Sequence, residues 1–160
     1  MFRHKSSFRS VILTKLTENH RKVIKSSFEI FKKNGVPNAH NIFLRMFKEY
    51  PDYKNVWSQF KNMSDEELSQ TPLLWKHATT FVFGLERVIR TMDDQEMMIL
   101  MIHSTANQHK SWGLKKEHFF AMVHLITDIL MEEKGEPDEK YAIMEAWESF
   151  YDVLGTLVEY

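Results

Sequence analysis

The glycines and prolines of this chain stand mostly at breaks between stretches whose apolar residues recur at three- and four-residue steps. Only 5 glycines and 4 prolines occur in 160 residues, and no stretch alternates apolar and polar residues as a half-buried strand would. Apolar positions at this spacing gather on one face of an α-helix. The sequence therefore predicts an all-α fold of seven or eight helices joined by short connections, which favour a compact helical domain.

Capping residues and breakers mark where these helices should begin and end. Gly113 is expected to give a tight corner, and Gly135 is expected to close the helix before it. Serine, threonine and aspartate are good N-caps, and proline is tolerated in the first turn. The expected helices begin near Thr17, Pro37, Ser64, Pro72, Asp93 or Asp94, Lys115 and Pro137.

Composition supports one domain with a substantial core. The chain is 43% hydrophobic and 13% aromatic, which argues against disorder. It has no cysteine, so disulfides, thiolate chemistry and a cysteine zinc site are excluded, and a reducing cytosol fits. No apolar run approaches the ~20 residues that a membrane span needs. We therefore expect a cytoplasmic location.

The formal net charge of −1 is unevenly distributed along the chain. Residues 1–16 contain four basic and no acidic side chains, whereas the remainder contains 17 basic and 22 acidic ones. A basic segment of this kind is either a solvated tail or a contact for anionic lipid or nucleic acid. We expect a basic N-terminal extension over 1–16, with weak contact to an anionic membrane as the open alternative and no nucleic-acid partner.

An imidazole interrupts the apolar face of one predicted helix. In WKHATTFVFGL, residues 75–85, His77 lies among apolar residues at helical spacing. A lone histidine on such a face is commonly buried with an ordinary hydrogen-bond partner. Neutral imidazole is also the commonest metal ligand, so the same position suits a metal or a ligand. The spacing alone leaves both interpretations open.

A second imidazole near the end of the following helix favours a metal. His109 precedes Gly113, and the next helix begins at once with Leu114 and Phe119 expected to point inward. Two antiparallel helices that each offer one imidazole to a cleft lined by phenylalanine suit a flat apolar group that carries a metal, such as haem. His103 is the rival ligand, but it lies about 240° round the helix from His109, and the corner favours His109.

Other candidate ligands in this region have simpler explanations. His118 and His124 lie six residues apart and do not share a helix face, so we expect them at the surface or beside ordinary partners. The methionines between 97 and 101 are better explained as core filler than as axial ligands.

Five segments resemble the globin family in the right order and spacing, over about residues 16–158. NIFLRMFKEYP (41–51) is similar to the end of the second globin helix and the proline that follows, and the QF of VWSQF falls in the corner that packs on the haem. KHATTFVFGL is similar to the fifth helix with its distal histidine, and QHKSWGLKKEHF to the proximal histidine, the corner and the seventh helix. AWESFYDVL suits the last helix. The resemblance implies a globin domain over 17–160 that encloses a haem pocket.

The same resemblance implies the residues that bind the cofactor, haem b (iron protoporphyrin IX). His109 would be the proximal iron ligand and His77 the distal residue, so both are candidate metal ligands. The other residues expected to line the haem pocket are Phe43, Trp57, Phe60, Phe81, Leu114 and Phe119.

Two positions depart from the family pattern. Trp57 stands at the corner position where globins almost always have phenylalanine, and Thr105 stands four residues before His109, where leucine is usual. A tryptophan still offers a large aromatic face to a porphyrin, so haem binding remains the expectation. The altered pocket shape puts ordinary oxygen carriage in doubt.

Three functions are compatible with these features. The first is a bis-histidyl, hexacoordinate haem globin of the nerve or invertebrate type, acting in oxygen or redox sensing or in electron transfer. The second is a reversible oxygen carrier or store, and the third is a helical interaction domain without haem. Because Phe43, Trp57 and Phe81 leave little room for an external ligand, we favour the first. Its partners would be oxygen or another diatomic gas and an electron-transfer protein; no enzyme substrate site is evident, although haem redox chemistry is compatible.

Overall fold

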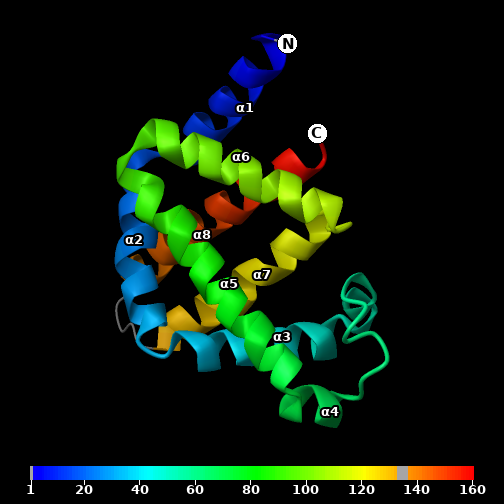
Figure 1. The fold of residues 1–160 in the computed structure, drawn as a ribbon. Coiled ribbons are helices and arrows are strands. Elements are labelled where there is room, and N and C mark those ends of the chain that lie inside the picture. The colour runs from blue at the N-terminus through cyan, green and yellow to red at the C-terminus, as the bar shows by residue number, and fades with distance from the viewer. Residues whose placement is uncertain (1, 133–136) are drawn as a thin grey trace.

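The computed structural model of this protein describes residues 2–132 and 137–160, with the side chains of 2–7 and of Pro137 left aside. Within these ranges the chain forms eight α-helices, two short 3₁₀-helices and no strand, which confirms the all-α class (Figure 1). Gly135, expected to close a helix, lies outside the described residues. The elements are α1 (Phe2–Lys15), α2 (Glu18–Lys32), α3 (Gly35–Glu49), η1 (Pro51–Val56), α4 (Asp65–Gln70), α5 (Pro72–Arg90), η2 (Thr91–Asp93), α6 (Gln95–Ser111), α7 (Lys116–Glu132) and α8 (Pro137–Val158).

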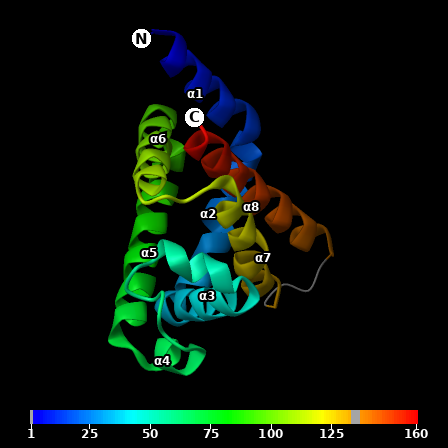
Figure 2. The same cartoon turned by 90° about the vertical axis from the view of Figure 1, so that its right-hand side faces the viewer.

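The helices pack in two layers around one core. α5 and α6 diverge from the corner at η2 and form one layer, while α2, α7 and α8 form the other (Figures 1 and 2). α8 packs against α7, α2 and α6, and α3 crosses between the layers to contact both α5 and α7. Each layer therefore buries its apolar face against the other, as a helical domain of this size requires.

The capping residues anticipated from the sequence act as caps. The hydroxyl of Thr17 accepts a hydrogen bond from the backbone N–H of His20, and the His20 ring accepts one in return from Thr17 N. Such caps satisfy backbone donors that have no partner within the helix. Side-chain caps also start α4, α5 and α6, from Ser64, Thr71 and Asp94 respectively.

One helix begins earlier than expected. α3 starts at Gly35, two residues before Pro37. Proline is tolerated there because a residue in the first turn has no intrahelical partner for its N–H. Gly35 is buried, and a Cβ atom at this position would lie 3.3 Å from Cγ1 of Val82. The small residue thus lets α3 approach α5 closely.

The basic N-terminal segment is helical and its last turn belongs to the core. Ile12 and Leu16 are fully buried, which differs from the solvated tail considered for residues 1–16. Arg9 pairs with Glu96 of α6. Lys15 pairs with an acidic residue of α8, Asp152. No helix in the described part of the chain is both long and apolar enough to cross a membrane.

Candidate functional site

His77 of α5 is surrounded by aromatic rings from two other elements. Its ring centroid lies 4.6 Å from that of Phe43 on α3, in an edge-to-face arrangement. Trp57 and Phe60, from the segment between η1 and α4, each lie 5.8 Å from His77. Three of the residues expected to line the haem pocket are therefore brought together around this imidazole.

A second set of ring contacts supports this group. Phe81, one turn beyond His77 on α5, lies 5.3 Å from Phe43 at a nearly perpendicular angle of 89°. Phe47 packs behind the group, 5.3 Å from Trp57 and 6.0 Å from Phe60. Edge-to-face aromatic packing of this kind restricts ring motion and excludes water. The surroundings of His77 are thus an apolar wall with one nitrogenous side chain in it.

The imidazole of His77 has no hydrogen-bond partner among the described residues. Burial, and secondarily the neighbouring His109, lowers the pKa of His77 from 6.5 to about 4. At neutral pH the ring is therefore uncharged and keeps a nitrogen lone pair available. A buried histidine ordinarily forms a hydrogen bond to a nearby group, but no described residue offers such a group to His77.

His109, near the end of α6, is held in one orientation by its own helix. Its Nδ1 donates a hydrogen bond to the carbonyl oxygen of Thr105 across 2.7 Å. A carbonyl can only accept, so the proton is on Nδ1 and the lone pair is on Nε2. Burial lowers the pKa of His109, and the bond to Thr105 offsets part of that effect. This is the tautomer and support that metal-binding histidines commonly have.

The corner after His109 is built as the sequence suggested. Gly113 has a positive φ of 85°, the left-handed conformation that glycine adopts without a steric cost. The N–H of Leu114 donates back to the carbonyl of His109 across 3.1 Å, which ends α6 just after that residue. Leu114 is partly buried against the core, and the ring of Phe119 lies 5.5 Å from that of His109.

The two imidazoles lie at matching positions on diverging helices. His77 is 14 residues before Thr91 and His109 is 15 residues after Asp94, so each stands about 20 Å along its helix from the corner. His109 also contributes to the lowered pKa of His77, so the charge of one ring would be felt at the other. α5 and α6 thus form a V (Figure 1). By their positions in the sequence, His77 and His109 lie toward the far ends of its two arms.

The donor set fits a metal carried by an organic ligand. The described residues contain no group of three or more His, Cys, Asp or Glu side chains that could hold a metal ion by themselves. Two neutral imidazoles between apolar walls would instead supply nitrogen ligands to a metal whose remaining ligands come from a macrocycle such as haem. The residues present therefore fit haem.

Some neighbours of the site could not be identified from the sequence. Trp112 is 55% exposed, yet its ring lies 5.1 Å from that of His109. The role of the Thr105 carbonyl could not be predicted from the sequence, because every residue type has a backbone carbonyl. Phe47 could have been found, since it follows Phe43 by one helical turn.

The rival histidines have other partners. His103 lies 4.5 Å from the ring of Phe8 of α1 and is not part of the aromatic group. His118 is buried rather than at the surface, and its Nδ1 accepts the N–H of Lys115 across 2.8 Å. The ring of His124 lies 2.8 Å from the carboxylate of Glu49.

Comparisons with known proteins point to one family. The family model described as Globin matches residues 40–157. Hemoglobin-3 of Phacoides pectinatus is 28% identical over 101 residues, which cover 62% of this chain and 66% of that protein, so the match spans about two thirds of the relative. A myoglobin structure from Aplysia limacina aligns with a TM-score of 0.79 at 16% identity, covering 90% of this chain and 97% of that one. A hexacoordinated haem protein from an anhydrobiotic tardigrade aligns with a TM-score of 0.74 at 17% identity, covering 91% and 96%.

Proposed function

This chain belongs to the globin family and is accordingly a haem-binding protein, and from that premise we propose that His109 binds the iron on the proximal side while His77 closes the sixth position at rest. One observation carries the proposal: His77 is a neutral imidazole with no hydrogen-bond partner among the described residues, within electrostatic reach of His109. An iron porphyrin supplies reversible binding of diatomic gases and one-electron redox chemistry. The haem type proposed is haem b.

The proximal half depends on a preorganised nitrogen. The hydrogen bond from His109 to Thr105 orients the ring before any metal arrives and makes Nε2 a better donor. Trp112 and Phe119 flank the ring and limit its rotation. The Gly113 corner then directs Leu114 back under the same side. These contacts would retain the cofactor by holding one nitrogen in place.

The distal half depends on competition for one coordination position. Phe43, Trp57 and Phe60 surround His77 and leave it no polar partner, so its lone pair is most stable when it binds a metal. The aromatic walls also keep water from serving as the sixth ligand. The likeness to a protein described as hexacoordinated supports this arrangement at the level of the fold.

A site closed by its own side chain suits oxygen or redox sensing, or electron transfer, better than bulk oxygen carriage. External ligands would bind only after His77 leaves, whereas electrons can pass without such a step. An electron-transfer partner and a cytoplasmic location stay predictions.

Oxygen carriage or storage is the second candidate. It is favoured by the likeness to proteins named hemoglobin and myoglobin. In this case His77 would not bind the iron and would donate a hydrogen bond to the ligand instead. The two candidate functions differ in whether His77 binds the iron in the resting protein.

The absorption spectrum of the ferrous, deoxygenated protein tests the proposal. We expect low-spin bands in the wild type and a five-coordinate, high-spin spectrum in His77→Leu. His103→Leu, a matched change on α6 away from the aromatic group, should keep the wild-type spectrum. A five-coordinate spectrum already present in the wild type would reject internal coordination and leave oxygen carriage as the better candidate. Purified protein without a Soret band would leave only the haem-free interaction domain.

A further inference from the structure

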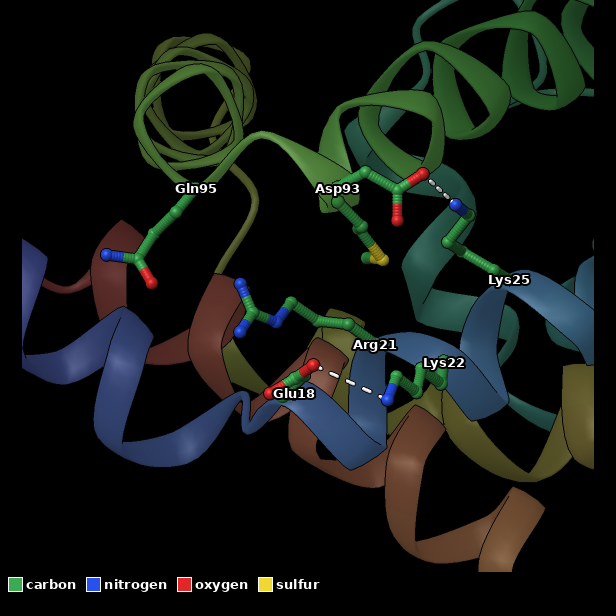
Figure 3. A pocket seen from close by; sticks show the side chains of 7 residues that line it. Glu18, Arg21, Lys22, Lys25, Asp93 and Gln95 are labelled. Carbon is green, nitrogen blue, oxygen red and sulfur yellow. Dashed lines mark hydrogen bonds and ion pairs between the residues drawn. The ribbon is translucent and has the colours of Figure 1, made fainter.

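A polar cavity lies between the first turns of α2 and the corner that joins α5 to α6 (Figure 3). Its volume is about 230 Å³, and it contains none of the residues assigned to haem. Three of its side chains are cationic and two are anionic. The lining residues are Glu18, Arg21, Lys22, Lys25, Met92, Asp93 and Gln95.

Two of the three cations are already paired. Lys22 Nζ lies 3.4 Å from a carboxylate oxygen of Glu18, one helical turn away. Lys25 pairs with Asp93 of η2, which ties α2 to the corner. These pairs account for both carboxylates of the lining, so the cavity keeps one positive charge in excess.

That excess charge belongs to Arg21. Its guanidinium lies between Glu18 and Gln95 in the close view, and no hydrogen bond or ion pair joins it to any described residue (Figure 3). Its Nε is buried from solvent and lacks an acceptor. A guanidinium stays charged at every physiological pH, and a buried donor without an acceptor is uncommon in folded proteins. The two terminal nitrogens, which also have no partner among the described residues, are the donors that a ligand entering the pocket can reach. A ligand that pairs with this positive charge should be an anion.

The directions of two helices add to the positive charge of the cavity. α2 begins at Glu18 and α6 begins at Gln95, so the N-terminal ends of two helices border the cavity. The N-terminus of a helix carries a partial positive charge. The N-cap of α6, Asp94, uses its carboxylate on the N–H of Met97 and does not line the cavity.

We propose that this cavity binds a small oxyanion, of the phosphate or carboxylate type, with Arg21 as the principal ligand. The planar guanidinium presents terminal N–H groups, on Nη1 and Nη2, that match two oxygens of such an anion. Gln95 can add a neutral donor from the start of α6, and the ion pairs of Lys22 and Lys25 border the site. The bound anion would join α2 to the corner between the two haem-binding helices.

Isothermal titration calorimetry of the full chain, with haem bound, tests this at constant ionic strength set with sodium chloride. Inorganic phosphate and acetate are titrated in separate arms, which distinguish the phosphate type from the carboxylate type. We expect saturable binding of at least one of them to the wild type. Arg21→Gln should weaken that binding at least tenfold, whereas Arg87→Gln, which removes the same charge from an exposed position on α5, should leave it unchanged.

Arg21→Lys covers the case in which Arg21→Gln fails to fold. It keeps the charge but not the pair of parallel donors, so it should bind more weakly than the wild type. The proposal is overturned if neither anion binds saturably to the wild type. It is overturned equally if Arg87→Gln weakens binding as much as Arg21→Gln, because the effect would then be one of overall charge.

Discussion

The Nδ1–H group of His109 donates a hydrogen bond to the backbone carbonyl of Thr105, one turn earlier on α6, across 2.7 Å. A single hydrogen bond thus decides which nitrogen of this histidine is available to a metal. The partner is a main-chain atom within the same helix, so the arrangement exists before the cofactor binds. Affinity for haem should consequently depend on His109 more than on any other histidine of the chain.

Replacement of His109 by alanine should abolish most haem retention. The bond from Nε2 to the iron is lost, and water gains access to the space beside Phe119. The measurement is the ratio of Soret to protein absorbance after gel filtration, compared with that of the wild type. His103→Ala is the control and should change the ratio little. The opposite order of the two variants would show that the proximal ligand is His103.

Replacement of His77 by leucine should raise affinity for oxygen. If the internally coordinated form makes up about 99% of the resting protein, only the open fraction binds, and removal of His77 raises affinity roughly 100-fold, or about 2.7 kcal/mol. Oxygen binding curves of the wild type and His77→Leu measure this directly. An unchanged or lower affinity in the variant would contradict internal coordination, since a distal histidine that only donates a hydrogen bond strengthens binding.

Gly113→Ala should destabilise the protein, because φ at this residue is 85° and an L side chain is strained in that conformation. The expected loss is about 1–2 kcal/mol in the free energy of unfolding, measured with urea. Gly84→Ala is a matched control within α5, where a Cβ would meet nothing within 4 Å. That change should be neutral or stabilise by about 0.5–1 kcal/mol. Equal losses in both variants would mean that the corner conformation is not the cause.

Deletion of residues 1–16 should lower stability substantially, because it removes the fully buried side chains of Ile12 and Leu16. Loss of a buried aliphatic side chain costs about 2–5 kcal/mol. Deletion of residues 1–7 keeps both and should cost little. Urea unfolding of the two truncated chains makes the comparison, and similar stability of both would show that the last turn of α1 contributes nothing.

The membrane alternative for the same segment needs a separate measurement. If the basic residues contact anionic lipid, the full chain should sediment with anionic vesicles at low salt and be released as salt rises. The chain without residues 1–7, which lacks Arg3 and Lys5, should sediment less. Equal sedimentation of both chains would exclude a lipid contact through these two residues.

His118 should make stability depend on pH. Burial lowers the pKa of His118, with a smaller opposing effect from Glu117. Its Nδ1 accepts a hydrogen bond from the backbone N–H of Lys115, which only the unprotonated nitrogen can do. The unfolded chain therefore binds a proton more readily than the folded one. The contribution of His118 to the free energy of unfolding is fully present above about pH 6.5. It is lost as pH falls through the lower pKa that His118 has in the folded protein.

A variant that cannot titrate isolates this effect. His118→Asn keeps an acceptor near the position of Nδ1, so its free energy of unfolding should fall less than that of the wild type between pH 7 and pH 4.5. His103→Asn, at a position without this contact, should follow the wild type. If His118→Asn also follows the wild type, the bond to Lys115 does not depend on the protonation state.

Helix ends could be predicted because their causes are local. Thr17, Ser64, Thr71 and Asp94 satisfy donors within three residues of themselves, and sequence spacing shows such pairs directly. The start of α3 was missed by two residues because its cause is tertiary: Gly35 permits close contact with another helix. A pattern within one helix carries no information about such a contact.

The candidate site likewise has residues that the sequence predicts and contacts that depend on tertiary packing. Spacing along α5 and α6 indicated His77 and His109, but the ring contacts among Phe43, Trp57 and Phe60 depend on how three separate elements pack. The sequence therefore supplied the ring types without their arrangement. The missing partner of Arg21 also had no sequence signal, because lack of a partner is evident only when every neighbour is placed.

α5 and α6 diverge from η2, so a small change of angle at η2 would be amplified at their far ends. Each arm is about 20 Å long from η2 to its imidazole, so a rotation of about 5° there moves the far end by nearly 2 Å. That displacement is about the length of a metal–nitrogen bond. Met92 lies in η2 and is 3% exposed. A substitution that repacks Met92 would therefore move His77 relative to His109 by a larger distance than it moves the residues next to Met92. The strength of the proposed internal coordination would thus depend on residues that never touch the cofactor.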